Sequence, residues 1–204
     1  MGSVRPIRPL RKEPPALHTR AMDNLRYIRE KMEGASEFTG LPGWGGVAMG
    51  ITALGAAWLA SHQPTRSLWL EIWIGEALLS ISIAAGAVVR KVKRAAIPLL
   101  SKPGRRFAFS FSPPMFAGLL LTIALFQAGF DRLLPGAWLL LYGASVTAGG
   151  ALSVKPVPIM GTLFMMLGAA CFLVPVNIES IILGAGFGAL HLAFGYHITR
   201  HYGG

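Results

Sequence analysis

The stretch LWLEIWIGEALLSISIAAGAVV at residues 68–89 decides the fold class of this chain. At a rise of about 1.5 Å per residue, a helix of this length crosses the hydrocarbon core of a bilayer, which is about 30 Å thick. The stretch contains no Lys or Arg, and its only ionisable side chains are Glu71 and Glu76. It therefore predicts a transmembrane helix.

Comparable apolar stretches recur along the chain, which is 53% hydrophobic and only 14% charged, a balance that is wrong for a soluble domain. We predict spans at residues 44–60, 68–89, 114–129, 134–152, 157–174 and 178–198, and the third helix has an alternative start as early as Phe107, with Pro113 and Pro114 then at a kink. The short connections at 61–67, 130–133 and 175–177 force neighbouring helices to be antiparallel. The expected fold is an all-α polytopic membrane protein, with six transmembrane helices as three hairpins over residues 42–204.

The distribution of Lys and Arg predicts the orientation, because positively charged loops stay in the cytoplasm. Eight of these residues precede the first span, seven lie between the second and third, and Lys155 and Arg200 fall on the same side. Only Arg66 and Arg132 fall on the other side. Both termini are therefore expected in the cytoplasm. Tryptophans near the predicted span ends are expected at the headgroup level: Trp44, Trp58, Trp69, Trp73 and Trp138.

The segment before the first span divides into two stretches. Residues 1–15 are basic and proline-rich and predict a disordered tail, and residues 16–41 predict a cytoplasmic amphipathic helix with its linker. Three roles are open for this helix: to lie flat on the anionic inner leaflet, to dock on another protein, or to pack on the inner loops of its own chain. Its candidate contacts are Arg20, Arg26 and Arg29 for headgroups, and Leu17, Leu25 and Ile28 for an apolar surface.

Glu76 is the main candidate for an intramembrane site, because a charge at the bilayer centre costs about 2.5–3.5 kcal/mol on insertion scales. Ser80 follows it by four residues on the same helix face, and Tyr142 on the fourth span reaches about the same depth. His191 is the deepest histidine of the last span. Two interpretations stay open: a proton or cation site, or a neutral carboxylic acid that hydrogen-bonds two helices together.

Several other classes of site are not expected. Cys171 is the only cysteine, so neither an intramolecular disulfide nor a cysteine metal cluster is expected. No other span carries a histidine to pair with His191, so we predict no haem, metal or other cofactor. No phosphate-binding loop, zinc-protease helix or serine elbow is recognisable, which argues against an enzyme. The basic residues flank spans, and this pattern argues against nucleic-acid binding.

Glycines four residues apart predict close helix packing, within the bundle or between copies of the chain. The two clearest pairs are Gly46 with Gly50 in the first span and Gly184 with Gly188 in the last.

Three further stretches carry a resemblance. They are MDNLRYIR at residues 22–29 leading to PGWG at 42–45, then Arg105 and Arg106 with Pro113 and Pro114, and the closing histidine-rich helix that ends in YGG. Together they resemble a family of bacterial membrane proteins without an established activity. The resemblance implies a setting in the bacterial cytoplasmic (inner) membrane and supplies no site residue.

The function predicted from the sequence is that of a non-enzymatic inner-membrane protein. It would be a sensory, regulatory or scaffold component whose N-terminal amphipathic helix engages the membrane surface or a protein partner. The alternative is a small proton-coupled transporter or permease that uses the Glu76 carboxyl.

Overall fold

The computed structural model describes residues 21–28, 42–95, 101–151 and 153–202 of the chain. All regular elements in these ranges are helices, and the described residues contain no strand, as the predicted all-α class requires. The chain divides into two compact units, Met1–Ser36 and Glu37–Gly204.

In the first unit, residues 21–28 form a helix whose residues are all exposed, including Leu25 and Ile28 with 60% and 51% of their surface accessible. Arg26 lies in the same helix. The helix covers a portion of the predicted amphipathic segment, whose contacts stay a prediction. The predicted tail at 1–15, together with Leu17, Arg20 and Arg29, lies outside the described residues.

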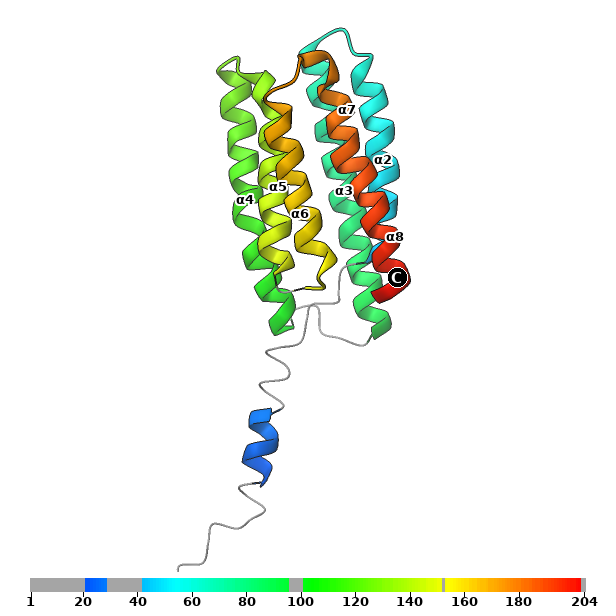
Figure 1. The fold of residues 1–204 in the computed structure, drawn as a ribbon, viewed down its shortest axis with the longest axis vertical. Coiled ribbons are helices and arrows are strands. Elements are labelled where there is room, and N and C mark those ends of the chain that lie inside the picture. Colours follow the sequence, from blue (N-terminus) through cyan, green and yellow to red (C-terminus); the bar gives the residue numbers. More distant parts are fainter. Residues whose placement is uncertain (1–20, 29–41, 96–100, 152, 203–204) are drawn as a thin grey trace, which may run out of the picture. The chain divides into compact units, whose positions relative to one another are not determined.

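The second unit is a helical bundle (Figure 1). Its helices are α2 (Gly43–Ser61), α3 (Arg66–Ala95), α4 (Lys102–Gln127), α5 (Leu134–Gly150) and α6 (Pro156–Cys171), followed by α7 (Glu179–Leu183), the π-helical segment η3 (Gly184–Leu190) and α8 (His191–Tyr202). The 3-10 turns η1 (Asp131–Leu133) and η2 (Val176–Ile178) precede α5 and α7. We call the end of the bundle at Gly43 and Arg94 the basic end, and the end at Ser61 and Arg66 the turn end.

Five helical stretches are long and apolar enough to cross a membrane: α2, α3, α4, Asp131–Gly150 and Glu179–Tyr202. The chain is therefore consistent with a multi-pass membrane protein. The predicted span at 157–174 corresponds to α6, an apolar helix of 16 residues. At about 24 Å, α6 is shorter than the hydrocarbon core.

The third predicted helix begins before both of its predicted starts, Pro114 and Phe107. Helix α4 begins at Lys102 rather than Pro114, and Pro113 and Pro114 lie inside it. The Ser101 hydroxyl accepts a hydrogen bond from the Gly104 amide and so caps the helix at this early position.

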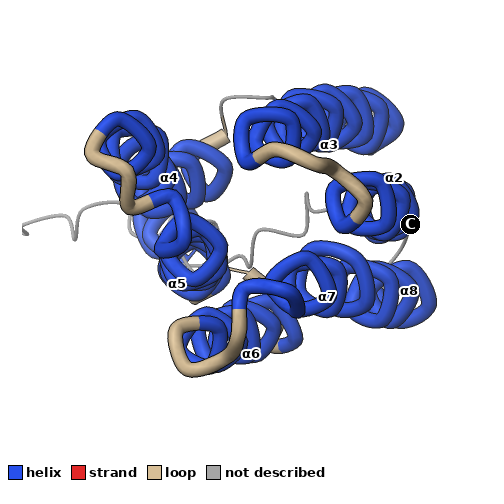
Figure 2. The backbone as a smooth tube through the Cα atoms, turned by 90° about the horizontal axis from the view of Figure 1, so that it is seen from above, coloured by secondary structure: helices blue, strands red, loops and turns tan. Residues whose placement is uncertain are grey.

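The helices form two halves, which Figure 2 shows from above. In the first half, α2 packs against α3 and against the last helix, α7 to α8; in the second half, α5 packs against α4 and α6. The pairs α2–α3 and α4–α5 are adjacent, as hairpins would be. The last helix packs mainly on α2, however, and α6 packs mainly on α5, so the three-hairpin arrangement is not confirmed.

Glycine seams hold the central pairs of both halves together. A Cβ atom placed on Gly50 would lie 2.8 Å from the Gly188 carbonyl oxygen, and one on Gly143 would lie 2.6 Å from the Gly161 carbonyl oxygen. A Cβ atom on Gly46 would likewise lie 3.2 Å from the Gly195 Cα. The close packing predicted for the glycine pairs therefore occurs inside this chain.

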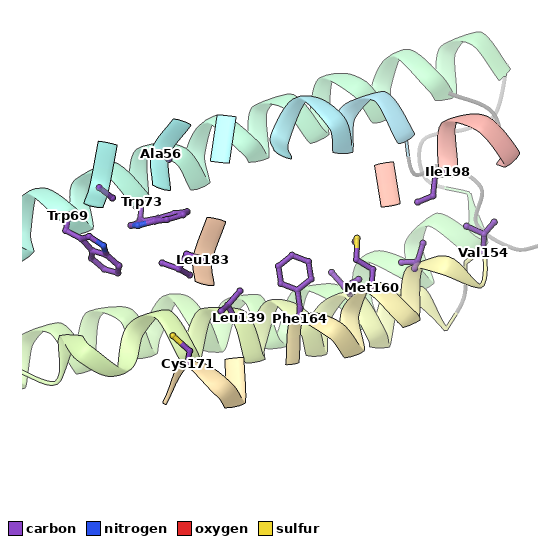
Figure 3. Close-up of a cluster of buried hydrophobic side chains, with 13 residues drawn as sticks. Ala56, Trp69, Trp73, Leu139, Val154, Met160, Phe164, Cys171, Leu183 and Ile198 are labelled. Atoms are coloured by element: carbon purple, nitrogen blue, oxygen red, sulfur yellow. The ribbon is translucent and has the colours of Figure 1, made fainter. Parts of the chain in front are cut away.

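Buried apolar side chains fill the space between the halves (Figure 3). Leu139, Phe164 and Leu183 have no accessible surface. Trp69 and Trp73 are only 5% and 4% exposed, so their rings lie inside the bundle, and their predicted depth at the headgroup level stays a prediction. Both indoles pack within the bundle, because α3 directs them against side chains from the other helices.

The seam between α2 and α8 predicts a sharp difference between two glycines of α2. Gly50→Ala forces a methyl group against the backbone of α8, and overpacking of this kind costs about 1–3 kcal/mol. Gly55→Ala is the matched control, since a Cβ there meets nothing within 4 Å. Thermal unfolding in detergent micelles should show a lower midpoint for the first variant only. Equal midpoints for the two variants would contradict the seam.

Candidate functional site

The polar candidates from the sequence lie at mid-length of the long helices and are largely buried. Glu76 belongs to α3 and Tyr142 to α5, and His191 is the first residue of α8, directly after η3. Glu76 is 8% exposed and His191 5% exposed. The structure separates these residues into two hydrogen-bonded groups.

The first group joins α2 to α3 around Glu76. The Thr52 hydroxyl donates to Glu76 Oε1 at 2.8 Å, and the Ser80 hydroxyl donates to the same oxygen at 2.7 Å. The shared helix face predicted for Glu76 and Ser80 is thereby confirmed. Thr52 was not predicted, and its only signal in the sequence is that it is a hydroxyl residue at mid-length of an otherwise apolar span.

The second group joins the two halves. The Tyr142 hydroxyl lies 2.7 Å from His191 Nε2, and His191 Nδ1 lies 2.9 Å from the Phe187 carbonyl oxygen. Because a carbonyl oxygen only accepts, Nδ1 carries the proton. Nε2 of the neutral imidazole is then the acceptor, and the tyrosine donates.

Aromatic rings surround this tyrosine–histidine pair. The Phe164 ring centre lies 4.8 Å from that of Tyr142 and 5.4 Å from that of His191. Phe187 lies 5.2 Å from Tyr142, and Phe111 meets it edge-on at 6.2 Å. The pair is thus a polar contact inside an aromatic cluster, where a hydrogen bond that loses its partner leaves a buried polar group unsatisfied.

The Tyr142 hydroxyl, which the sequence places level with Glu76, is therefore bound to His191. The Glu76 group and the tyrosine–histidine pair are linked by contacts between aromatic rings. Trp73, three residues before Glu76 on α3, has its ring centre 6.2 Å from that of Phe187. Phe187 belongs to η3, and π-helical segments inside α-helices are frequent at functional sites.

A third polar network lies at the turn end. Arg66 binds Asp131 through Nε at 2.6 Å and forms an ion pair with the Glu179 carboxylate at 2.8 Å. Its guanidinium also stacks on Trp69 at 3.9 Å, and Trp69 Nε1 donates to the Ser180 hydroxyl at 3.0 Å. This network was not predicted. The sequence does carry a signal for it, because each of the three connections at the turn end has a charged residue where the next helical element begins: Arg66, Asp131 and Glu179.

Within the described residues, no group of three or more histidine, cysteine or acidic side chains is placed to hold a metal ion. His197 and His201 stack at 4.3 Å near the basic end, away from the tyrosine–histidine pair.

Comparisons with protein families, with curated proteins and with solved structures give no match for this chain. The function must therefore be inferred from the residues and their geometry.

A double-mutant cycle tests the bond between the halves. Tyr142→Phe and His191→Leu each remove one partner, and the pair should show a coupling energy of about 0.6–1.7 kcal/mol, the range for hydrogen bonds between transmembrane helices. The measurement is the free energy of unfolding in mixed micelles. Tyr196→Phe is the control, because Tyr196 is 51% exposed and its hydroxyl accepts a hydrogen bond from the exposed Arg200. Additive effects of the two single substitutions would show that the bond contributes nothing.

Proposed function

We propose that this chain is a non-enzymatic component of the bacterial inner membrane, with six spans and both termini in the cytoplasm, that acts as a sensory or regulatory protein. In this proposal the two halves of the bundle are the sensing element, and the N-terminal helix is the output.

The observation that carries the proposal is the Tyr142–His191 bond between two halves that are otherwise joined mainly by side-chain packing. A regulatory protein needs an element with two discrete arrangements whose balance a signal can shift. The α2–α8 and α5–α6 pairs are held by backbones that touch at glycines, so motion is favoured between these pairs rather than within them. The tyrosine–histidine pair lies at this contact, where a change of partner alters the energy of the arrangement.

The proposed output is the helix at residues 21–28. Its exposed side chains include Met22, Leu25, Tyr27 and Ile28, each more than half accessible. A short helix with such a surface gains stability by binding a lipid surface or a protein. We favour the membrane surface, since basic residues flank the apolar positions and the inner leaflet is anionic.

A fluorescent probe tests the link between sensing element and output. We would attach an environment-sensitive fluorophore to Leu25→Cys in a Cys171→Ser background and reconstitute the full chain in nanodiscs. The expected emission is that of a membrane-bound probe, and Tyr142→Phe should shift it because the halves lose their polar contact. Tyr196→Phe should leave it unchanged.

If the fluorophore on the labelled protein without further substitutions emits as it does in water, the membrane-bound output is refuted. An identical spectrum in the parent and in the Tyr142→Phe variant would refute the coupling between the bundle and the N-terminal helix.

Glu76 supports a second candidate function, a small proton-coupled transporter. Its carboxyl is buried about a third of the way along α3, and intramembrane carboxyls are common proton carriers. Two hydroxyl donors on one carboxyl oxygen equally suit a structural role, so the geometry permits both.

Glu76→Gln separates the two roles. The amide keeps a carbonyl oxygen for the Thr52 and Ser80 hydroxyls, so the fold should be retained, but it cannot carry a proton. If Glu76 transports protons, vesicles with an imposed pH gradient should lose the protein-dependent flux in this variant and keep it in Glu71→Gln, an exposed position on the same helix. Absence of flux in the parent protein, or equal flux in both variants, would rule out the transport function.

A further inference from the structure

A groove of about 460 Å³ runs between α2 and α3 at the basic end of the bundle. Its floor lies where Gly45 of α2 approaches Ala87 of α3, since a Cβ on Gly45 would lie 2.8 Å from the Ala87 methyl group. Gly86 also lines the groove, and a Cβ there would meet nothing within 4 Å. The groove therefore exists because small residues on both helices leave space.

The lining changes character along α3. Ile83, Gly86 and Ala87 form an apolar section of the groove, and further along the same helix Arg90, Lys91 and Arg94 form a basic section. No acidic side chain is among the described residues that line it. The groove thus has an apolar section and a positively charged section, in sequence along the helix.

The length of α3 places this change at the membrane boundary. The helix has 30 residues and is about 45 Å long, whereas the hydrocarbon core is about 30 Å thick. If Arg66 lies in the headgroup layer at the turn end, a span of about 20 residues ends near Gly86. The basic residues from Arg90 onward then lie in the opposite headgroup layer.

We propose that this groove binds one anionic phospholipid. Arg90, Lys91 and Arg94 bind its phosphate, because guanidinium groups match phosphate oxygens in a bidentate geometry and an ammonium adds a point charge. One acyl chain lies along Ile83 and the exposed surface at Gly86. The half-exposed Trp44, 60% accessible, lines the groove at the start of α2, where an indole suits the interface.

The charge and apolar gradient of the groove match those of a phospholipid, and this is the reason to choose a lipid over a soluble anion. A soluble phosphate would use only the basic section and leave the apolar section unfilled. This site is separate from the Tyr142–His191 pair and from Glu76, and its test does not depend on either function proposed above.

Native mass spectrometry of the full chain in detergent tests the proposal by titration with phosphatidylglycerol or with phosphatidylcholine of the same acyl chains. We expect phosphatidylglycerol to bind at least tenfold more tightly. Arg90→Gln with Arg94→Gln should weaken its binding by about 30-fold, the effect of two basic residues near an anionic headgroup. Lys93→Gln is the charge control, since Lys93 is exposed on the same helix and does not line the groove.

A second pair of variants tests the shape of the groove without changing its charge. Gly86→Phe should fill it and reduce lipid binding at least tenfold. Gly75→Phe is the matched control, because Gly75 lies on the same helix, also faces open space and does not line the groove. Circular dichroism and gel filtration would confirm that the variants are folded, and the comparison of the two lipids requires no variant at all.

Five outcomes would overturn the proposal. The first three are equal affinity for the two lipids, equal loss in Lys93→Gln and in the double variant, and equal loss in Gly86→Phe and Gly75→Phe. The fourth is displacement of the lipid by inorganic phosphate at comparable concentration, which would identify a soluble-anion site. If deletion of residues 1–34 raises lipid affinity tenfold or more, the native occupant is the N-terminal segment of the chain, and the proposal also fails.

Discussion

The close approach of helix backbones at glycine is the constraint on which the rest of this structure depends. Between helices in a bilayer, apolar side chains gain little from leaving lipid, so association requires dense packing or hydrogen bonds. The α2–α8 pair meets this requirement through Gly43, Gly50 and Gly195, and the α5–α6 pair through Gly143 and Gly161. Helix α8 packs mainly on α2, so the last helix of the bundle lies beside the first. The closing helix therefore does not form a simple hairpin with α6.

The contact between the halves is of a different kind. It is made by aromatic rings, by the Tyr142–His191 bond and, at the turn end, by Arg66 of the first half with Asp131 of the second. Trp69 stacks on Trp138 across the same boundary, with the rings nearly parallel at 5.5 Å. Glycine seams tolerate no shift without a backbone clash, whereas rings and hydrogen bonds can exchange partners. The two kinds of contact thus distinguish two tightly packed helix pairs, α2–α8 and α5–α6, from a boundary between them that can be rearranged.

The sequence was informative about single helices and less so about their partners. Length and apolar content located the five helical stretches that are long and apolar enough to cross a membrane, and the four-residue spacing placed Ser80 beside Glu76. Sequence could not assign Tyr142 to His191, because depth along a helix says nothing about which helix stands opposite. The tryptophans show the same limit: an indole near a helix end suits a lipid-facing position or a stack with another ring. Only the packing of Trp69 against Trp138 and Ser180 decides between them. The early start of α4 was predicted only as far back as Phe107, because two consecutive prolines normally mark a helix start, and here the Ser101 cap lies well before them.

Helix α3 connects the features that carry the proposals. It begins at Arg66 in the turn-end network and passes Trp69, Trp73 and Glu76 in its first half. Its last turn, which includes Arg94, lies beside the groove. Among the described residues its main packing partner is α2, so it is held less firmly than α2 or α5. A lipid bound between α2 and α3 would add contacts where this helix has few, and would favour the arrangement in which the two lie together. Because Trp73 packs on Phe187 beside the Tyr142–His191 pair, a restraint on α3 at the basic end also restrains one wall of the aromatic cluster. Lipid composition is therefore a natural input for a sensing element formed by the two halves.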